Sequence, residues 1–167
     1  MPLLYIMCGL SFSGKTTLAR AIANATESVI VSYDELYATR RDPAVTGLDE
    51  WYQLIALMDD EVRGHLAAGR SVVVDNLNED LVDRDRLRGV AEESGADAVV
   101  VFVDTPPEVA VTRLRANERT KERGATTERH FEFVRSKLEP PGPPERCVAF
   151  RPGDDLDAWL RALPRSD

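Results

Sequence analysis

The sequence has few cysteines and no long hydrophobic run. Its 167 residues include only two cysteines, Cys8 and Cys147, and a disulfide framework or a zinc site would need more of them. No segment reaches the roughly 18 uninterrupted apolar residues of a membrane-spanning helix, and no basic leader precedes the first apolar segment. We therefore expect two buried thiols, no membrane partner and a cytoplasmic location.

Positive charge is outweighed by negative charge. The formal net charge is −8 at pH 7 and the pI is close to 4.9. An acidic surface repels nucleic acid unless a basic groove forms locally, and the stretch 113–129 is rich in arginine. A nucleic-acid ligand is therefore disfavoured, although such a groove could admit one. The apolar content of 43% and the lack of a linker or repeat predict a single globular domain over residues 1–167, as a monomer or a homodimer.

A glycine-rich motif lies near the start of the chain. Residues 9–16 read Gly-Leu-Ser-Phe-Ser-Gly-Lys-Thr, which is the pattern G-x-x-x-x-G-K-[ST]. Its glycines let the backbone fold around a phosphate with successive N–H groups pointing inward. The apolar segment 3–8 before it is typical of a buried strand, and the spacing over 17–23 is helical. A helix N-terminus is therefore predicted to point at an anion.

This motif predicts how a nucleotide is held. Lys15 can reach the β- and γ-phosphates, and the Thr16 hydroxyl can hold Mg²⁺. We expect nucleotide contacts from the motif residues Gly9, Ser11, Phe12, Ser13, Gly14, Lys15, Thr16 and Thr17.

Apolar segments alternate with helical patterns along the rest of the chain. Such segments occupy residues 28–32, 71–75, 98–103 and 146–150. Strands that are apolar throughout and separated by helices form a parallel sheet covered on both faces. The pattern therefore predicts a three-layer α/β/α fold around a parallel sheet of roughly five strands. Because the carboxyl ends of such strands meet at one edge, that edge should gather the glycine-rich loop, Asp34, Asp75 and Asp104.

Local signals predict where several elements begin. Residues 38–49 are polar and contain proline and glycine, which favours a loop. Thr105 is expected to cap a helix whose first helical residue is Pro106. A closing helix from about Asp154 is expected to bury Leu156 on its apolar face.

Taken together, these segments resemble the small P-loop kinases, a group that includes polynucleotide 5′-kinase domains, chloramphenicol phosphotransferase and zeta-toxin-like kinases. The resemblance covers nearly the whole chain and is carried by residues 9–17, 31–36, 72–78 and 104–108 together with Arg113. It implies a P-loop NTPase fold, ATP and Mg²⁺ as cofactors, and transfer of the ATP γ-phosphate to a hydroxyl group. It also implies that Asp34 is the general base.

One departure from the group bears on the acceptor. Polynucleotide kinases usually carry arginine three residues after the base, where this chain has Tyr37, so Arg40 or Arg41 would have to replace it. We therefore expect a small-molecule acceptor. The alternatives are a polynucleotide 5′-hydroxyl kinase and an ATP-binding switch or regulatory protein that transfers nothing.

Each candidate carboxylate has a structural alternative. Asp34 either accepts the proton of the acceptor hydroxyl or caps a short helix beginning at Glu35. Asp75 either holds Mg²⁺ through water or acts as a structural cap, and Asn78 either contacts substrate or finishes a turn.

The arginine-rich stretch predicts a lid over about 113–128. Arginines that close over the β- and γ-phosphates would stabilise charge and exclude water. We expect Arg113 to bind the nucleotide, and at least one of Arg119 and Arg123 to contact the phosphates during transfer.

Overall fold

Five short apolar segments form the strands of one parallel sheet. The computed structural model describes residues 1–121 and 126–166. Within these ranges the sheet has the order β2-β3-β1-β4-β5, and every neighbouring pair is parallel. The strands are β1 (Leu3–Cys8), β2 (Val29–Ser32), β3 (Val72–Asp75), β4 (Asp97–Val103) and β5 (Cys147–Phe150). The predicted parallel sheet is confirmed, with the glycine-rich loop following its central strand.

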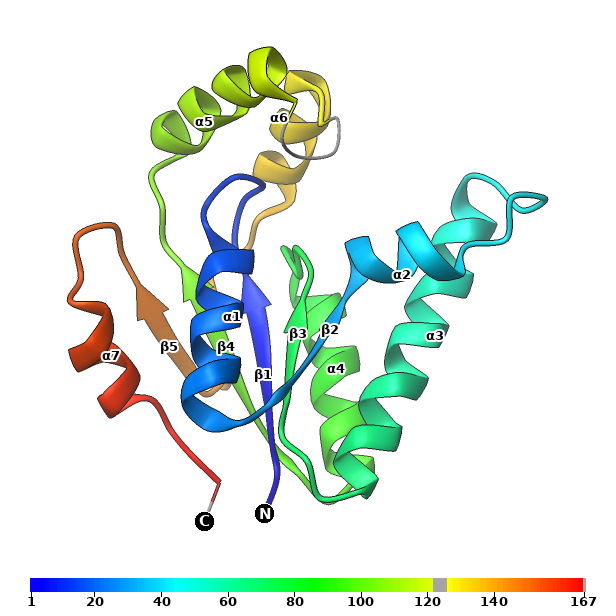
Figure 1. Cartoon of the computed structure of the whole chain (residues 1–167), viewed down its shortest axis with the longest axis vertical. Helices are drawn as coiled ribbons and strands as arrows, with labels where there is room; N and C mark the ends of the chain where they lie inside the picture. The colour runs from blue at the N-terminus through cyan, green and yellow to red at the C-terminus, as the bar shows by residue number, and fades with distance from the viewer. Residues whose placement is uncertain (122–125, 167) are drawn as a thin grey trace.

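Helices cover both faces of the sheet, which confirms the three layers (Figure 1). One face packs against α1 and α7, and the other against α3 and α4. The helices in the described ranges are α1 (Lys15–Thr26), α2 (Tyr33–Arg40), α3 (Leu48–Ala67), α4 (Leu81–Glu93), α5 (Pro107–Thr120), α6 (Glu128–Lys137) and α7 (Leu156–Ala162). None of them is long and apolar enough to cross a membrane.

The helices α5 and α6 include parts of the segment predicted as a lid, residues 113–128, and are called the lid helices below for that reason alone. They lie above the carboxyl ends of the strands (Figure 1). A separate apolar cluster joins them to the glycine-rich loop. Leu10 of the loop is buried in this cluster, and Phe12 packs against it, together with Leu114 of α5 and Phe131 of α6. The lid helices therefore pack against the glycine-rich loop through this cluster.

The first turn of α5 differs from the sequence prediction. The helix begins at Pro107 with Pro106 as its N-cap, so the expectation that Thr105 is the cap is wrong. A residue that precedes proline is disfavoured in the α region. Pro106 accordingly stays extended, with φ −52° and ψ 134°, and the helix starts one residue later.

Three further local predictions need correction. α2 continues to Arg40, so residues 38–40 are helical; the chain turns extended only at Arg41. α7 covers just seven residues and reaches the core through Trp159 and the following Leu163, which leaves Leu156 39% exposed. Of the two thiols expected to be buried, Cys8 is buried and Cys147 only half-buried.

Candidate functional site

The loop between β1 and α1 needs its two glycines. Gly9 has φ +146° and Gly14 has φ +106°, angles that residues with a side chain rarely adopt. At Gly9 a Cβ atom would also lie 2.9 Å from the carbonyl oxygen of Val103. The loop therefore folds tightly against β4, as the glycine pattern predicted.

The loop leaves polar groups without partners at the start of α1. Gly14 is the N-cap of α1 and provides no side-chain hydrogen bond to the N–H groups of the first turn. The Ser13 hydroxyl is buried and has no hydrogen-bond partner among the described residues. Uncapped helix N–H groups and a buried hydroxyl are groups that an anion can satisfy. The loop thus fits a phosphate group.

Lys15 lies inside this loop. Its side chain is 8% exposed, and Nζ donates a 2.6 Å hydrogen bond to the carbonyl oxygen of Leu10. Burial lowers the pKa of Lys15 to about 8, and the nearby acidic groups, Asp75 first among them, oppose this shift. The acidic groups of the protein therefore offset only part of the cost of burying the Lys15 charge, and this favours an anionic ligand beside Nζ.

Thr16 and Asp75 bring two oxygen donors together next to Lys15. Asp75 ends β3 and is 8% exposed. Burial raises the pKa of its carboxyl group, while a hydrogen bond from the Thr16 side chain and the charge of Lys15 act in the opposite direction. Mg²⁺ in nucleotide sites takes one or two protein oxygens and completes its shell with phosphates and water. A hydroxyl beside a carboxylate fits that requirement, and no group of three metal-ligating side chains occurs in residues 1–121 and 126–166.

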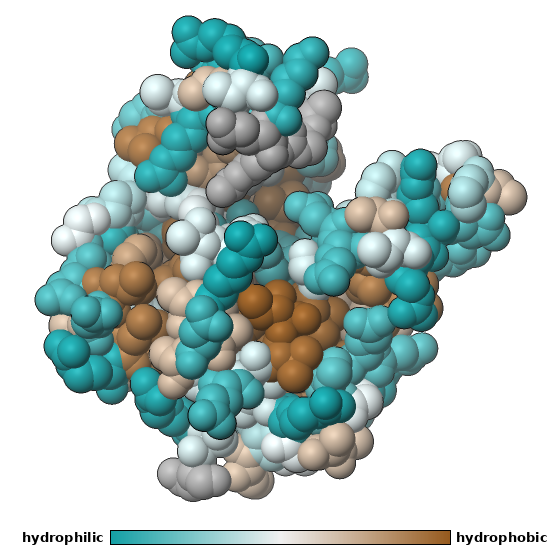
Figure 2. All heavy atoms as spheres, in the orientation of Figure 1, coloured by the Kyte–Doolittle hydropathy of each residue, from teal (hydrophilic) through white to brown (hydrophobic). Residues whose placement is uncertain are grey.

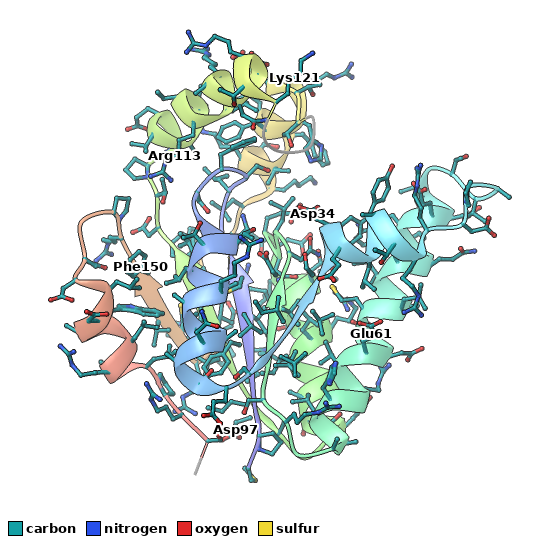
Figure 3. All side chains as sticks on the ribbon, viewed as in Figure 1. Asp34, Glu61, Asp97, Arg113, Lys121 and Phe150 are labelled. Carbon is teal, nitrogen blue, oxygen red and sulfur yellow. The ribbon has the colours of Figure 1, made fainter. Side chains whose placement is uncertain are left out.

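Asp34 lies beside this pair, on the neighbouring strand end. Ser32 of β2 is paired with Asp75 of β3, and Asp34 follows two residues later in the first turn of α2. The N-cap of α2 is Ser32, so the alternative that Asp34 caps a helix starting at Glu35 is wrong. Its side chain is exposed at the rim. Asp34 and Arg113 lie on opposite sides of the loop (Figure 3).

Arg113 and Thr105 hold the loop from the lid side. The Arg113 Nη1 atom donates to the carbonyl oxygens of Phe12 and Ser13, each at 3.1 Å. The Thr105 hydroxyl, which does not cap α5, donates to the Ser13 carbonyl oxygen at 2.8 Å. Sequence reasoning missed this role of Thr105. The signal was the Pro106-Pro107 pair, which displaces the helix start.

Three other arginines belong to the stretch predicted as a lid. Arg119 lies in the last turn of α5 and is exposed. Arg123 falls outside the residues that the structure describes. Arg115 pairs with Glu128 at 2.6 Å and so joins the two lid helices.

A cavity of about 560 Å³ adjoins the loop on the Arg113 side. It lies between α1, α5 and the turn from β5 to α7, and Figure 2 shows hydrophobic side chains over β5 and the start of α7. Its apolar walls include Leu18, Val103, Phe150, Pro152 and Leu156. This cavity could not be foreseen from local patterns, because Leu156 has the spacing of a core residue. Leu156 is partly exposed because it lines the wall of this cavity.

Asn78 is enclosed, and its Oδ1 atom has no hydrogen-bond partner among the described residues. Its side chain is 0% exposed, and Nδ2 donates to the carbonyl oxygen of Met7 at 2.7 Å. Of the two roles left open, the contact with Met7 favours the structural one. Asp104 also has a structural contact, an ion pair with Arg151 at 2.9 Å.

We expect Lys15→Met to stabilise the unliganded protein at pH 7. The pKa of Lys15 is lowered in the fold, from 10.5 to about 8, so the unfolded chain holds the proton more tightly and burial of the charge opposes folding below pH 8. At 1.36 kcal/mol per pKa unit, removing the charge should raise the unfolding free energy by roughly 3 kcal/mol.

The difference between wild type and Lys15→Met should shrink from pH 8 to pH 10.5, since the folded wild type loses the proton first in that window. Urea unfolding at pH 7 and at pH 9.5 measures both effects, with the exposed Lys137→Met as a control expected to change neither. Two results would contradict the conclusion that the buried Lys15 charge destabilises the fold. One is a Lys15→Met protein less stable than the wild type at pH 7, and the other is a difference in unfolding free energy that does not depend on pH.

Comparisons with known proteins identify the family and the fold of this chain. A family model described as an AAA domain, AAA_33, matches residues 4–141. Similar solved structures include Kti12 from Chaetomium thermophilum in complex with ADP-AlF3 (TM-score 0.75, 23% identity, covering 95% of this chain and 94% of that one). The APS kinase CysC of Mycobacterium tuberculosis, in complex with AMPPNP and APS, has TM-score 0.70 and 19% identity over 96% and 94% of the two chains. A gluconokinase from Sinorhizobium meliloti 1021 has TM-score 0.68 and 22% identity over 96% and 88%.

No curated protein matches the sequence. At these identities the solved structures show the fold, and the family model covers most of the chain. The chain belongs to the AAA_33 family of AAA domains and has the α/β fold of the small P-loop kinases.

Proposed function

We propose that this protein is an ATP-dependent phosphotransferase that moves the γ-phosphate of ATP to a hydroxyl group of a small-molecule acceptor. One observation carries the proposal: Lys15, the Thr16–Asp75 pair and Asp34 lie at adjacent strand ends around a loop that fits phosphate. The neighbouring folds include kinases of small molecules, and two were solved with AMPPNP or ADP-AlF3.

The nucleotide would lie across the start of α1. Its phosphates would meet the uncapped N–H groups of α1 and the Lys15 ammonium group, and its base would enter the apolar cavity. The cavity volume of about 560 Å³ is within the range of roughly 300–1,000 Å³ for small-molecule sites. Arg113 lines both the loop and the cavity, so it would fix the junction between triphosphate and base.

Thr16 and Asp75 would hold Mg²⁺, which neutralises phosphate charge when it is bound. The chain itself supplies positioning. Thr105 and Arg113 hold the carbonyl groups of Phe12 and Ser13 outward, so that the loop N–H groups remain directed at the phosphates. Phosphoryl transfer depends mainly on such positioning and on electrostatic stabilisation.

Asp34 is the proposed general base. An alcohol is a weak nucleophile, and a carboxylate that accepts its proton during transfer accelerates the reaction by typically 10²–10⁴-fold. The Asp34 side chain is exposed at the carboxyl edge of the sheet, so its oxygens are accessible to an acceptor. A switch that transfers no phosphate has no need of such a group.

The acceptor side favours a small molecule over a polynucleotide. Tyr37 occupies the position where polynucleotide kinases carry arginine, and the two nearby arginines have other partners. Arg40 pairs with Glu61 at 3.0 Å. Arg41 donates to the Tyr37 hydroxyl at 3.0 Å and lies over its ring. Neither is poised to bind a phosphate backbone.

Asp34→Asn should retain ATP binding and lose transfer. The substitution keeps the side-chain shape and removes proton acceptance, so transfer should fall by roughly 10²–10⁴-fold. Labelled ATP is first tested with nucleosides, aminoglycosides, phenicols and 5′-hydroxyl oligonucleotides to find an acceptor. Transfer by Asp34→Asn is then compared with Glu35→Gln, which changes the adjacent exposed carboxylate of α2. Normal transfer by Asp34→Asn would remove the proposed base, and phosphorylation of oligonucleotides alone would favour the polynucleotide kinase.

Arg119→Ala or Arg123→Ala should lower kcat with little change in ATP affinity. A side chain that contacts the phosphates chiefly in the transition state has this signature. Arg135→Ala is the matched control, because Arg135 is exposed and its ion pair with Glu132 lies within α6. If both test variants turn over as the wild type does, the proposed lid contact belongs to neither residue.

A further inference from the structure

Arg84 of α4 is the largest side chain that is fully enclosed in the described structure, at 1% exposure. Its Nε and Nη2 atoms donate to the carboxylate of Glu145 at 2.7 and 3.1 Å, and Glu145 is also buried. A buried ion pair is often no more stabilising than well-packed apolar residues of similar size. Stability alone therefore does not account for this pair.

The remaining nitrogen of Arg84 reaches the turn between β3 and α4. Nη1 donates to the carbonyl oxygens of Asn78 and Glu79 at 3.1 and 3.2 Å. Asn78 has φ +45°, in the left-handed region, so this turn is held in an unfavourable conformation. Asp75 lies at the start of the same turn.

The opposite side of this turn is bonded to the phosphate-binding loop. The N–H group of Gly9 donates to the carbonyl oxygen of Leu77 at 3.2 Å. Two residues earlier, in β1, the Met7 carbonyl oxygen accepts from Asn78 Nδ2. The turn is thus fixed between Arg84 on one side and the loop on the other.

The return segment, which connects α6 to β5, is hydrogen-bonded to the same turn. The N–H group of Glu139 donates to the Glu79 carbonyl oxygen at 2.8 Å, and the Glu139 carboxylate accepts from the Leu81 N–H group at 3.2 Å. Glu145 ends this return segment. Arg84 is therefore the point at which the turn after Asp75, the end of β1 and the return from the lid meet.

We propose that Arg84 is a positioning residue for the metal-dependent part of nucleotide binding. It fixes the turn that follows Asp75 relative to the loop that carries Thr16, and so sets the distance between the two oxygens of the proposed Mg²⁺ site. The inference rests on the nucleotide-binding half of the proposed function and does not depend on an acceptor. Groups hydrogen-bonded to a metal ligand typically change metal affinity by about 10–100-fold when they are lost. Arg84 acts through the backbone three and four residues after Asp75, so a smaller loss is expected.

The double variant Arg84→Met/Glu145→Met tests this role. A single Arg84→Met change would leave the Glu145 carboxylate buried without its partner and endanger folding, whereas apolar replacement of both partners preserves the core. The double variant removes the donors to Asn78 and Glu79. Arg84→Lys is the second variant, since it keeps the charge and loses the fork of donors. The exposed pair of α4, changed in Arg88→Met/Asp85→Asn, is the control.

Calorimetric titration gives the Kd for ATP with excess Mg²⁺ and with EDTA, and urea unfolding gives the stability of each protein. We expect the double variant to weaken Mg²⁺–ATP binding by up to about 10-fold, with a smaller change for ATP in EDTA. Its unfolding midpoint should fall, because the carbonyl groups of Asn78 and Glu79 lose their buried donor. Arg84→Lys should weaken Mg²⁺–ATP binding selectively and less. The control should bind as the wild type does.

If the double variant binds ATP more weakly by the same factor with and without Mg²⁺, the positioning role is overturned. Wild-type Mg²⁺–ATP affinity in both the double variant and Arg84→Lys would overturn it as well. If the double variant does not fold, Arg84→Lys decides in the same way. A wild-type protein that binds no ATP in either buffer would overturn the proposed function itself, and the inference with it.

Discussion

The burial of one ammonium group shapes the carboxyl edge of this sheet. β1 is buried along its whole length, and α1 starts without a side-chain cap, so Lys15 enters a loop that water barely reaches. Burial disfavours its charge. Asp75, Glu79 and Asp34, on two neighbouring connections, partly offset that cost, and the Leu10 carbonyl accepts one of its hydrogen bonds. A phosphate bound in the loop would supply the missing negative charge. The buried ammonium group would then favour nucleotide binding, whereas it destabilises the unliganded fold.

Two sets of contacts keep this loop in shape from opposite sides. On the lid side, Arg113 and Thr105 hold its carbonyl groups, and its apolar residues pack under α5 and α6. On the other side, the turn after Asp75 bonds to Gly9 and is fixed in turn by Arg84. Both sets connect the loop to the segments that enter and leave the lid helices. A change in the conformation of the loop on phosphate binding would therefore alter contacts at both ends of the lid helices.

Local patterns predicted the sheet, the loop and the carboxylates at the strand ends, because apolar strands and glycine spacing are encoded within a few residues of each other. They failed where a long-range contact decides the outcome. Arg84 carries a charge that local patterns place at the surface, yet it is buried against a partner 61 positions away. Leu156 has core spacing, but it lines a cavity that exists only once β5 and α1 are in place. The start of α5 could have been foreseen from the Pro106-Pro107 pair, whose effect on the preceding residue is local.

The central claim is that the loop around Lys15 binds the phosphates of ATP with Mg²⁺. The most direct measurement is the thermal stability of the unmutated protein with and without millimolar ATP and Mg²⁺, beside the variant Lys15→Ala. A ligand at 100 times its Kd stabilises the fold by about 2.7 kcal/mol, so the melting temperature of the wild type should rise by several degrees, while that of Lys15→Ala should not respond. No shift in the unmutated protein would contradict the account.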